Sequence, residues 1–155
     1  MSDASAPSTD GGDLPIVLFV CTHNSARSQM AEGLLRARFG DRYRARSAGT
    51  APSRVHPLAI RAMAELDIAL DGHSSKTVDA ATADAQPDIV VTVCDHARDA
   101  CPYVPARREN LHQAFPDPSA AEGDEAARLD AFRSARDAIG RWLDGRFGSA
   151  APAGA

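Results

Sequence analysis

The chain has 155 residues, 44% of them hydrophobic and 25% charged, which is typical of one soluble globular domain and leaves little room for two. The longest apolar run, residues 16–21, is far shorter than the ~20 residues of a membrane-spanning helix, so no membrane association is expected. Three cysteines, no recognisable secretory signal and a net charge of −4 favour a cytoplasmic protein that does not bind nucleic acid.

The predicted elements alternate between strand and helix along the chain. Small and polar residues at 1–13 and 149–155 predict disordered tails, with one domain at 14–148 between them. Strands are predicted where apolar and β-branched residues cluster, at 16–20, 43–48, 89–93 and 110–114. Helices are predicted from the spacing of apolar residues, at about 28–39, 57–66 and 125–147. This alternation predicts an α/β fold with a mainly parallel sheet, which binds ligands at the carboxyl ends of its strands.

The loop after the first strand has the composition of an oxyanion site. It reads Cys21-Thr22-His23-Asn24-Ser25-Ala26-Arg27-Ser28 and leads directly into the first predicted helix. Backbone N–H groups of such a turn and the positive end of the helix bind anions, and the Arg27 guanidinium adds two donors. The same field favours the thiolate form of cysteine, so Cys21 is predicted to be a nucleophile that faces a tetrahedral oxyanion of phosphorus or arsenic.

The spacing between Cys21 and Arg27 is weak support when it is taken alone. Cys101 and Arg107 have the same spacing, but that copy contains prolines, which lack N–H donors, and it joins no strand to a helix. A packed structural thiol is the alternative interpretation of Cys21. Other phosphate loops are excluded, because the only lysine, Lys76, follows no glycine-rich turn and no G-x-G-x-x-G motif is present.

The other two cysteines admit three interpretations. Cys94 ends the third predicted strand, which places it at the same sheet edge as Cys21, and Cys101 follows after a short polar segment. The two thiols could be packed in the core, or could form half of a zinc site with His96 and His112. The paired spacing that zinc sites usually need is missing, so no metal is expected. The third interpretation is a pair of thiols that resolves a modified Cys21.

Asp117 lies between two prolines in the loop after the fourth predicted strand. An Asp-Pro pair commonly marks no more than a turn. Its position after a strand of this sheet also makes Asp117 a candidate general acid.

Four sequence blocks, taken together, resemble one family. The blocks are VCTHNSARSQMAEG at 20–33, SAG at 47–49, VTVC at 91–94 followed by Cys101-Pro102, and FPDP at 115–118. They are similar to the thioredoxin-coupled arsenate reductases, which share the fold of the low-molecular-weight protein tyrosine phosphatases. The resemblance runs from about residue 16 to 147 and implies a four-stranded parallel sheet of order 2-1-3-4, flanked by helices.

The resemblance also implies a reaction, the reduction of arsenate to arsenite. Cys21 would attack arsenate held by Arg27 and the amides of the loop, with Asp117 as the general acid. Cys94 would then attack Cys21, Cys101 would attack Cys94, and thioredoxin would reduce the final disulfide. Because thiols supply the electrons, no bound cofactor is expected, and the protein is expected to be a monomer.

Three alternatives stay open at this point. A phosphatase would need only Cys21, Arg27 and Asp117, and its other cysteines would be dispensable. A non-catalytic module would bind phosphate, sulfate or a related oxyanion without turnover. The same reduction could also be coupled to glutaredoxin and a low-molecular-weight thiol in place of thioredoxin.

The chain departs from the family at the position of Lys76. Potassium-binding members carry a carboxylate there, whereas Asn24, Glu32 and Ser47 match the other positions of their ion site. Potassium binding is therefore not expected. The Lys76 ammonium is expected to lie beside Glu32 and to brace the loop in place of an ion.

Two further departures concern the loop and the substrate. His23 stands where a glycine is frequent in the family, which leaves the backbone geometry of the loop open. Ser119 stands where the phosphatases place an aromatic residue after the Asp-Pro pair. This second departure weakens the case for a phosphotyrosine substrate.

Overall fold

The computed structural model describes residues 14–70, 73–93 and 103–148. These residues form β2 (Ile16–Cys21), α1 (Arg27–Phe39), β3 (Arg44–Gly49), α2 (Pro57–Ala64), α3 (Val78–Ala81), β4 (Ile89–Thr92), β5 (Glu109–His112), the 3-10 turn η3 (Pro118–Ala120) and α4 (Glu125–Phe147). The predicted tails, Cys94, His96 and Cys101 lie outside the described residues. Within the described ranges, no helix combines the length and apolarity that crossing a bilayer would need.

The four strands form one parallel sheet in the order β3-β2-β4-β5. Numbered along the chain, this is the order 2-1-3-4, so the predicted topology is confirmed. Val20 of the central strand β2 lies between Ala48 of β3 and Thr92 of β4. The carboxyl ends of three strands therefore meet at one edge, beside Cys21.

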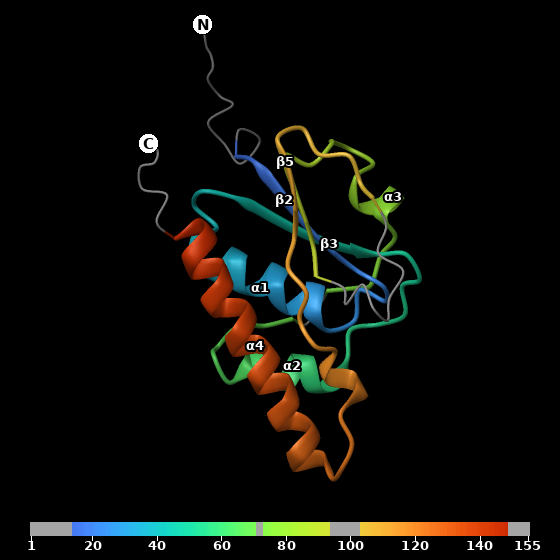
Figure 1. Cartoon of the computed structure of the whole chain (residues 1–155), viewed down its shortest axis with the longest axis vertical. Helices are drawn as coiled ribbons and strands as arrows, with labels where there is room; N and C mark the ends of the chain where they lie inside the picture. Colours follow the sequence, from blue (N-terminus) through green and yellow to red (C-terminus); the bar gives the residue numbers. More distant parts are fainter. Residues whose placement is uncertain (1–13, 71–72, 94–102, 149–155) are drawn as a thin grey trace, which may run out of the picture.

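Strand β2 is buried on both faces, which explains its continuous apolar sequence. Val17, Phe19 and Cys21 face the larger core, under α1, α2 and α4. The alternate residues Leu18 and Val20 face a smaller core that includes Ala81 of α3. Figure 1 shows the consequence: α1, α2 and α4 lie together on one side of the sheet, and α3 lies apart from them.

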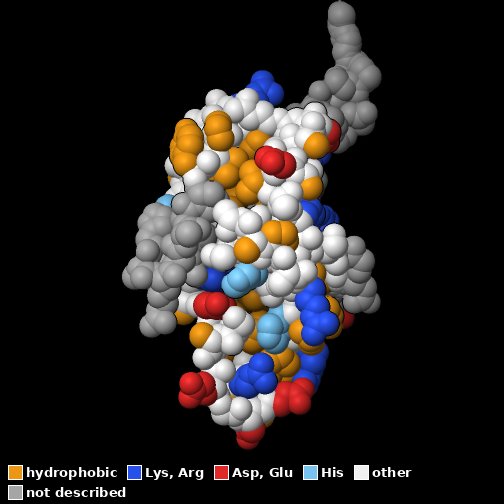
Figure 2. Space-filling model, turned by 90° about the vertical axis from the view of Figure 1, so that its right-hand side faces the viewer, with side chains coloured by type: hydrophobic (Ala, Val, Ile, Leu, Met, Phe, Trp, Pro, Cys, Tyr) orange, Lys and Arg blue, Asp and Glu red, His pale blue; other side chains and the backbone are white. Residues whose placement is uncertain are grey.

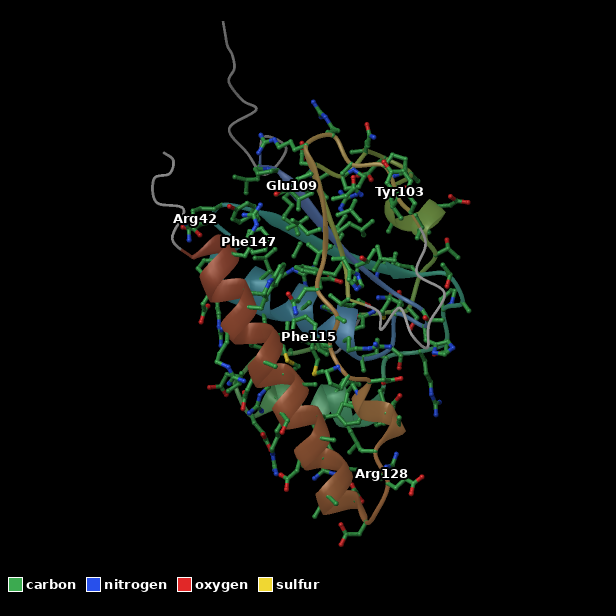
Figure 3. The ribbon with its side chains drawn as sticks, in the orientation of Figure 1. Arg42, Tyr103, Glu109, Phe115, Arg128 and Phe147 are labelled. Atoms are coloured by element: carbon green, nitrogen blue, oxygen red, sulfur yellow. The ribbon has the colours of Figure 1, made fainter. Side chains whose placement is uncertain are left out.

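Helix α4 packs against α1, α2 and η3, and it confirms the predicted apolar stripe. Its buried side chains include Leu129, Phe132, Ile139, Leu143 and Phe147. Phe147 and Phe115, labelled in Figure 3, both belong to the core between α4 and the sheet. Because Phe115 lies two residues before Asp117, this packing holds the start of the Asp117 loop against α4.

The strands and α1 differ from their predicted ranges by one or two residues at an end, and two further differences concern α2 and α3. Helix α2 ends at Ala64 rather than at 66, because Asp67 has a left-handed φ of 61° and Leu66, 40% exposed, has no core to face. Helix α3 was not expected from the spacing of apolar residues. It is a single turn that begins where the Thr77 side chain accepts a hydrogen bond from the N–H of Ala80.

Glu65 connects the end of α2 to α4 and makes the stability of the fold dependent on pH. Its carboxylate accepts hydrogen bonds from Arg133 at 2.7 Å and from Arg136 at 2.8 Å. These bonds, with that from Arg133 the larger influence, lower the pKa of Glu65 from 4.5 to about 2. The contribution of the ionised Glu65 carboxylate to the free energy of unfolding is therefore fully present above pH 4.5. This contribution is lost as the pH falls toward 2.

A Glu65→Gln variant should therefore unfold more easily than the wild type at neutral pH, and the two proteins should converge as the pH approaches 2. Urea unfolding midpoints measured across this range test the expectation. Glu122→Gln is the matched control, since Glu122 is exposed and the described chain shows no ion pair for it. A constant difference between wild type and Glu65→Gln at every pH would contradict the assignment.

Candidate active site

Cys21 is the last residue of the central strand and is only 2% exposed. Its Sγ lies 2.9 Å from the hydroxyl oxygen of Ser28, in the first turn of α1. The thiol therefore sits between the sheet edge and the helix that starts immediately after the loop, as the sequence predicts. We call residues 21–28 the anion loop.

The carbonyl groups of the anion loop point away from its interior. Backbone N–H groups of Ala51, Ser53 and His56 donate to the carbonyls of Thr22, His23 and Ser25 at 2.8, 3.2 and 3.0 Å. The Asn24 carbonyl accepts from the Ser75 hydroxyl at 2.7 Å. In a planar trans peptide, the N–H of the next residue points opposite to the carbonyl. The amides of residues 23–26 are therefore directed into the loop, where they can bind an oxyanion.

The sharpest turn of the loop is at Asn24, whose φ of 50° is left-handed. Asparagine tolerates this conformation better than most residues. Among the described non-glycine residues, only Asn24 and Asp67 have a positive φ, so His23 does not adopt the left-handed conformation that would favour a glycine there. Gly49 of β3 lies against the same turn, since a Cβ there would be 2.6 Å from the Thr22 carbonyl oxygen.

The positive end of α1 is open toward the loop. Its N-cap, Ala26, forms no side-chain capping hydrogen bond, and no acidic residue occupies the first turn. No side chain therefore offsets the positive end of the helix dipole at this point, and the dipole favours a negative ligand there.

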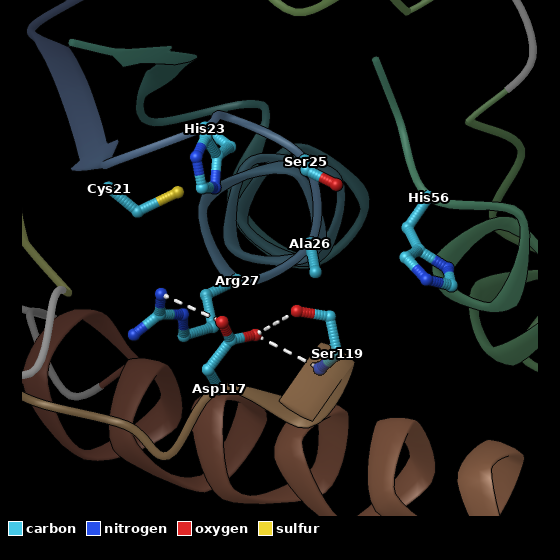
Figure 4. A pocket seen from close by; sticks show the side chains of 8 residues that line it. All are labelled: Cys21, His23, Ser25, Ala26, Arg27, His56, Asp117 and Ser119. Carbon is cyan, nitrogen blue, oxygen red and sulfur yellow. Dashed lines mark hydrogen bonds and ion pairs between the residues drawn. The ribbon is translucent and has the colours of Figure 1, made fainter. Parts of the chain in front are cut away.

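Arg27 is 4% exposed and is held by groups from two other parts of the sheet edge. Its guanidinium donates to the Phe115 carbonyl at 3.2 Å and to the Val93 carbonyl at 3.5 Å. A second nitrogen lies 3.7 Å from Oδ2 of Asp117. Figure 4 shows the guanidinium extending between Cys21 and Asp117. The side chain is therefore oriented before any anion binds.

Asp117 caps η3 with one oxygen and faces Arg27 with the other. Its Oδ1 accepts from the backbone N–H of Ser119 at 2.9 Å and from the Ser119 hydroxyl at 2.7 Å. The side chain is 35% exposed, so its second oxygen can reach both Arg27 and solvent. This arrangement allows Asp117 to exchange a proton with the site and with water.

These groups line one cavity of about 70 Å³, far smaller than the roughly 300–1,000 Å³ of typical small-molecule pockets. Its lining residues are Cys21, His23, Ser25, Ala26, Arg27, His56, Asp117 and Ser119. Figure 2 shows histidine side chains near the centre of one face, with acidic and basic side chains beside them. The structure thus brings together the predicted nucleophile, anion holder and general acid around a space suited to a small ion.

His56 is a lining residue that sequence reasoning missed. It caps α2, because its Nδ1 accepts the N–H of Leu58 at 3.0 Å, and its ring packs on Phe132 with centroids 4.6 Å apart. Burial first, and then the charge of Arg128, lowers the pKa of His56, so the ring is neutral near neutral pH. With Nδ1 accepting, the proton resides on Nε2. The only sequence signal was a His-Pro pair at a helix start.

Glu32 and Ser47 meet behind the anion loop, as the resemblance implies, but the cation beside them is not Lys76. The Ser47 hydroxyl donates to Glu32, and the guanidinium that pairs with Glu32 belongs to Arg36, one turn along α1. The Lys76 ammonium instead donates to the Ser74 carbonyl at 2.9 Å. This corrects the prediction for Lys76. Arg36 follows Glu32 by four residues on the same helix, so the two side chains are neighbours on its surface and form the ion pair.

Lys76 braces the loop through its main chain. Its backbone N–H donates to Oδ1 of Asn24 at 2.9 Å. The oxygens of Asn24 and Glu32 thus already face N–H and O–H donors, and a guanidinium beside Glu32 repels a cation. These residues do not fit a potassium ion. Elsewhere among the described residues, no group of three or more His, Cys, Asp or Glu side chains could hold a metal.

A family model matches residues 16–141, and its family is described as low molecular weight phosphotyrosine protein phosphatase. The chain therefore belongs to this family. The match includes every described residue of the cavity and the whole sheet. The fold expected from the sequence resemblance is thereby confirmed.

Relatives within this family are arsenate reductases by name. That of Halalkalibacterium halodurans is 41% identical over 126 residues, which span 81% of this chain and 90% of the relative. A solved arsenate reductase in a phosphate-binding state superimposes with a TM-score of 0.65 at 28% identity, covering 85% of this chain and 95% of the other. The thioredoxin-dependent arsenate reductase of Corynebacterium glutamicum has a TM-score of 0.62 at 26% identity, covering 85% and 61%.

Proposed function

We propose that this protein reduces arsenate to arsenite, with Cys21 as the nucleophile. The observation that carries the proposal is the small cavity where the Cys21 thiol, the Arg27 guanidinium and the Asp117 carboxyl converge. Inward amides and an open helix end favour a tetrahedral oxyanion there. The names of the relatives favour arsenate over a phosphate ester.

In the first step, the Cys21 thiolate attacks arsenic(V) and forms an S–As bond. One As–O bond breaks, and the departing oxygen leaves as water after it takes a proton from Asp117. Arg27 and the loop amides hold the remaining oxygens and their negative charge. No electrons have moved to arsenic at this stage, so the adduct is still arsenic(V).

In the second step, the thiolate of Cys94 attacks Sγ of Cys21. An S–S bond forms, the electron pair of the S–As bond stays on arsenic, and arsenite leaves as arsenic(III). Val93, the residue before Cys94, donates its N–H to the Val20 carbonyl at 2.9 Å, beside Cys21, which supports this assignment. Cys101 then attacks Cys94, and thioredoxin reduces the resulting disulfide. Thiols supply both electrons, so the reaction needs no bound cofactor.

The second candidate function is phosphate-ester hydrolysis, favoured by the family to which the chain belongs. It would use Cys21, Arg27 and Asp117 and would end with water in place of Cys94. Ser119, which follows the Asp-Pro pair, donates its hydroxyl to Asp117 rather than offering an aromatic surface to a phosphotyrosine ring. This contact favours the bare oxyanion as substrate.

One assay separates these functions. Arsenate-dependent NADPH oxidation is measured with thioredoxin and its reductase, and in parallel with glutathione, glutaredoxin and glutathione reductase. We expect sustained oxidation in the thioredoxin assay. Oxidation only in the glutaredoxin assay would replace the proposed reductant. Hydrolysis of p-nitrophenyl phosphate without NADPH oxidation in either assay would establish the phosphatase instead.

The relay makes a sharper prediction for Cys101→Ser. This variant should release about one arsenite per chain and then stop, because the Cys21–Cys94 disulfide cannot be passed on. Peptide mass spectrometry should detect that disulfide. Cys94→Ser is the matched control, and it should release no arsenite at all. Sustained thioredoxin-coupled turnover by Cys101→Ser would contradict the relay.

We also propose that the protein acts in the cytoplasm as a monomer. Its three cysteines must be reduced for the proposed chemistry, and the cytoplasm keeps thiols in this form. Its partners would then be arsenate, competing phosphate or sulfate, and thioredoxin.

A further inference from the structure

Two arginines beside the cavity have no acidic partner. Within the described part of the chain, Arg54 and Arg128 form no ion pair. By contrast, Arg61 of α2 pairs with Glu125 at the start of α4. The steps proposed above use neither Arg54 nor Arg128. Their positive charges are therefore available to an anion that approaches from solvent.

Arg54 is placed by two hydrogen bonds between its own segment and the anion loop. The backbone N–H of Ser53 donates to the His23 carbonyl at 3.2 Å. The backbone N–H of His56 donates to the Ser25 carbonyl at 3.0 Å. Arg54 lies between these two bonds in the chain, and its side chain is exposed. Because His23 and Ser25 both line the cavity, the charge of Arg54 lies beside it.

Arg128 approaches the same wall of the cavity from α4. It lies near the start of this helix, where Figure 3 labels it, and precedes Phe132 by four residues. Side chains at this spacing share one face of a helix. The Phe132 ring packs on the His56 ring, with centroids 4.6 Å apart, and His56 lines the cavity. The Arg128 side chain therefore lies beside the wall that His56 forms.

Both arginines affect the pKa of His56. Burial lowers this pKa most, Arg128 and Arg54 lower it further, and the Asp117 carboxylate opposes them. These charges act on the ring from α4, from the segment before α2 and from the loop before η3. The ring is therefore neutral near neutral pH. The positive charge at this wall comes from the two guanidiniums, which stay protonated in proteins.

The net charge of the molecule opposes the approach of an anion. The chain carries a charge of −4, and Arg27 inside the cavity faces Asp117 at 3.7 Å. When it is ionised, Asp117 offsets the field that Arg27 projects into solvent. A local positive potential beside a site raises the rate at which an oppositely charged ligand reaches it. Arg54 and Arg128 supply such a potential.

We propose that Arg54 and Arg128 form a basic rim, which attracts an oxyanion to the cavity and raises the rate at which the anion reaches Cys21. The inference deepens the proposed function, and it rests on that function only in taking Cys21 as the residue that meets the anion. The anion loop and Arg27 still hold the bound anion. Removing a charge of the basic rim should therefore slow the capture of anions and leave the reactivity of the thiolate unchanged.

Two alkylating reagents of different charge test the basic rim. Iodoacetate is an anion and iodoacetamide is neutral, and in both reactions the Cys21 thiolate forms an S–C bond and displaces iodide. The rate constant for Cys21 is measured with each reagent by mass spectrometry of its peptide, which separates it from the peptides of Cys94 and Cys101. A change in thiolate content or in folding alters both rate constants. The ratio of the iodoacetate to the iodoacetamide rate constant therefore reports the attraction of the charge.

The variants are Arg54→Gln, Arg128→Gln and the double variant. At low ionic strength, we expect the ratio to fall about two-fold in each single variant and about four-fold in the double variant, which is the effect of a unit charge about 10 Å away in water. The rate constant for iodoacetamide should keep its wild-type value. In 1 M salt, where the Debye length is about 3 Å, the variants and the wild type should give the same ratio.

Arg107→Gln is the matched control, because it removes the same charge from an exposed position outside the cavity. A wild-type ratio in the double variant at low ionic strength would overturn the inference. An equal fall in Arg107→Gln would also overturn it, because the net charge and not the basic rim would then attract the anion. Parallel losses with both reagents would assign the two arginines a structural role instead. The alkylation uses no arsenate, so a failure of arsenate reduction in the coupled assay would refute the proposed function and leave this result intact.

Discussion

Replacing Cys21 by Ser is expected to abolish arsenate-dependent turnover and to leave anion binding intact. A serine hydroxyl is protonated at neutral pH and, with no base beside it, is a far weaker nucleophile than a thiolate. Removing the nucleophile of a well-studied hydrolase lowers kcat by about 10⁶-fold, and we expect a loss of this order. The measurement is NADPH oxidation coupled to thioredoxin, compared with the rate without protein.

Anion binding should survive the substitution because the groups that hold the anion do not include the Cys21 side chain. Arg27 keeps its bonds to the Phe115 and Val93 carbonyls, and the loop carbonyls keep their external donors. A serine at position 21 can also keep the contact with the Ser28 hydroxyl. Calorimetric titration with phosphate should therefore give a dissociation constant close to that of the wild type. Sustained turnover, or loss of phosphate binding, would show that Cys21 has a different role.

Much of the fold could be predicted from the sequence because short stretches of residues specify its strands and helices. Residues 16–21 are apolar on every position, and the structure buries this strand on both faces. The anion loop was recognisable from Cys21 and Arg27 together with the strand before them and the helix after them. Asp117 was recognisable from its place after a strand, and the structure brings it into the same cavity.

The remaining features depend on contacts between residues far apart in the chain. Gln29 and His73 are separated by 44 positions, and no local pattern indicates that they share a hydrogen bond. The same is true of Arg27 and the Phe115 carbonyl, which are 88 positions apart. The sequence prediction placed the Lys76 ammonium beside Glu32 because Lys76 occupies the position where potassium-binding members of the family carry a carboxylate. The choice between Lys76 and Arg36 depends on side-chain reach, which only the folded chain determines.

Replacing Arg27 by Lys is expected to lower kcat/KM for arsenate by about 10²- to 10³-fold, although the charge is kept. Lysine offers a single ammonium and lacks the planar fork that binds two oxygens of an anion at once. Arg27 also donates to the carbonyls of Phe115 and Val93 while facing Asp117. One ammonium cannot replace two separately placed nitrogens, one held by both carbonyls and the other facing Asp117, so both the anion and the acid lose their fixed positions.

Arg107→Lys is the matched control, because Arg107 has the same spacing from Cys101 that Arg27 has from Cys21. Its side chain is 64% exposed and lies 3.8 Å from Asp88, outside the cavity. Steady-state kinetics with arsenate should therefore separate the two substitutions, with Arg107→Lys close to the wild type. Equal losses in both variants, or none in either, would contradict the role of Arg27. The comparison tests whether the spacing of cysteine and arginine is sufficient for the reaction. The alternative is that the reaction also requires this pair to lie between the end of a buried strand and the start of a helix.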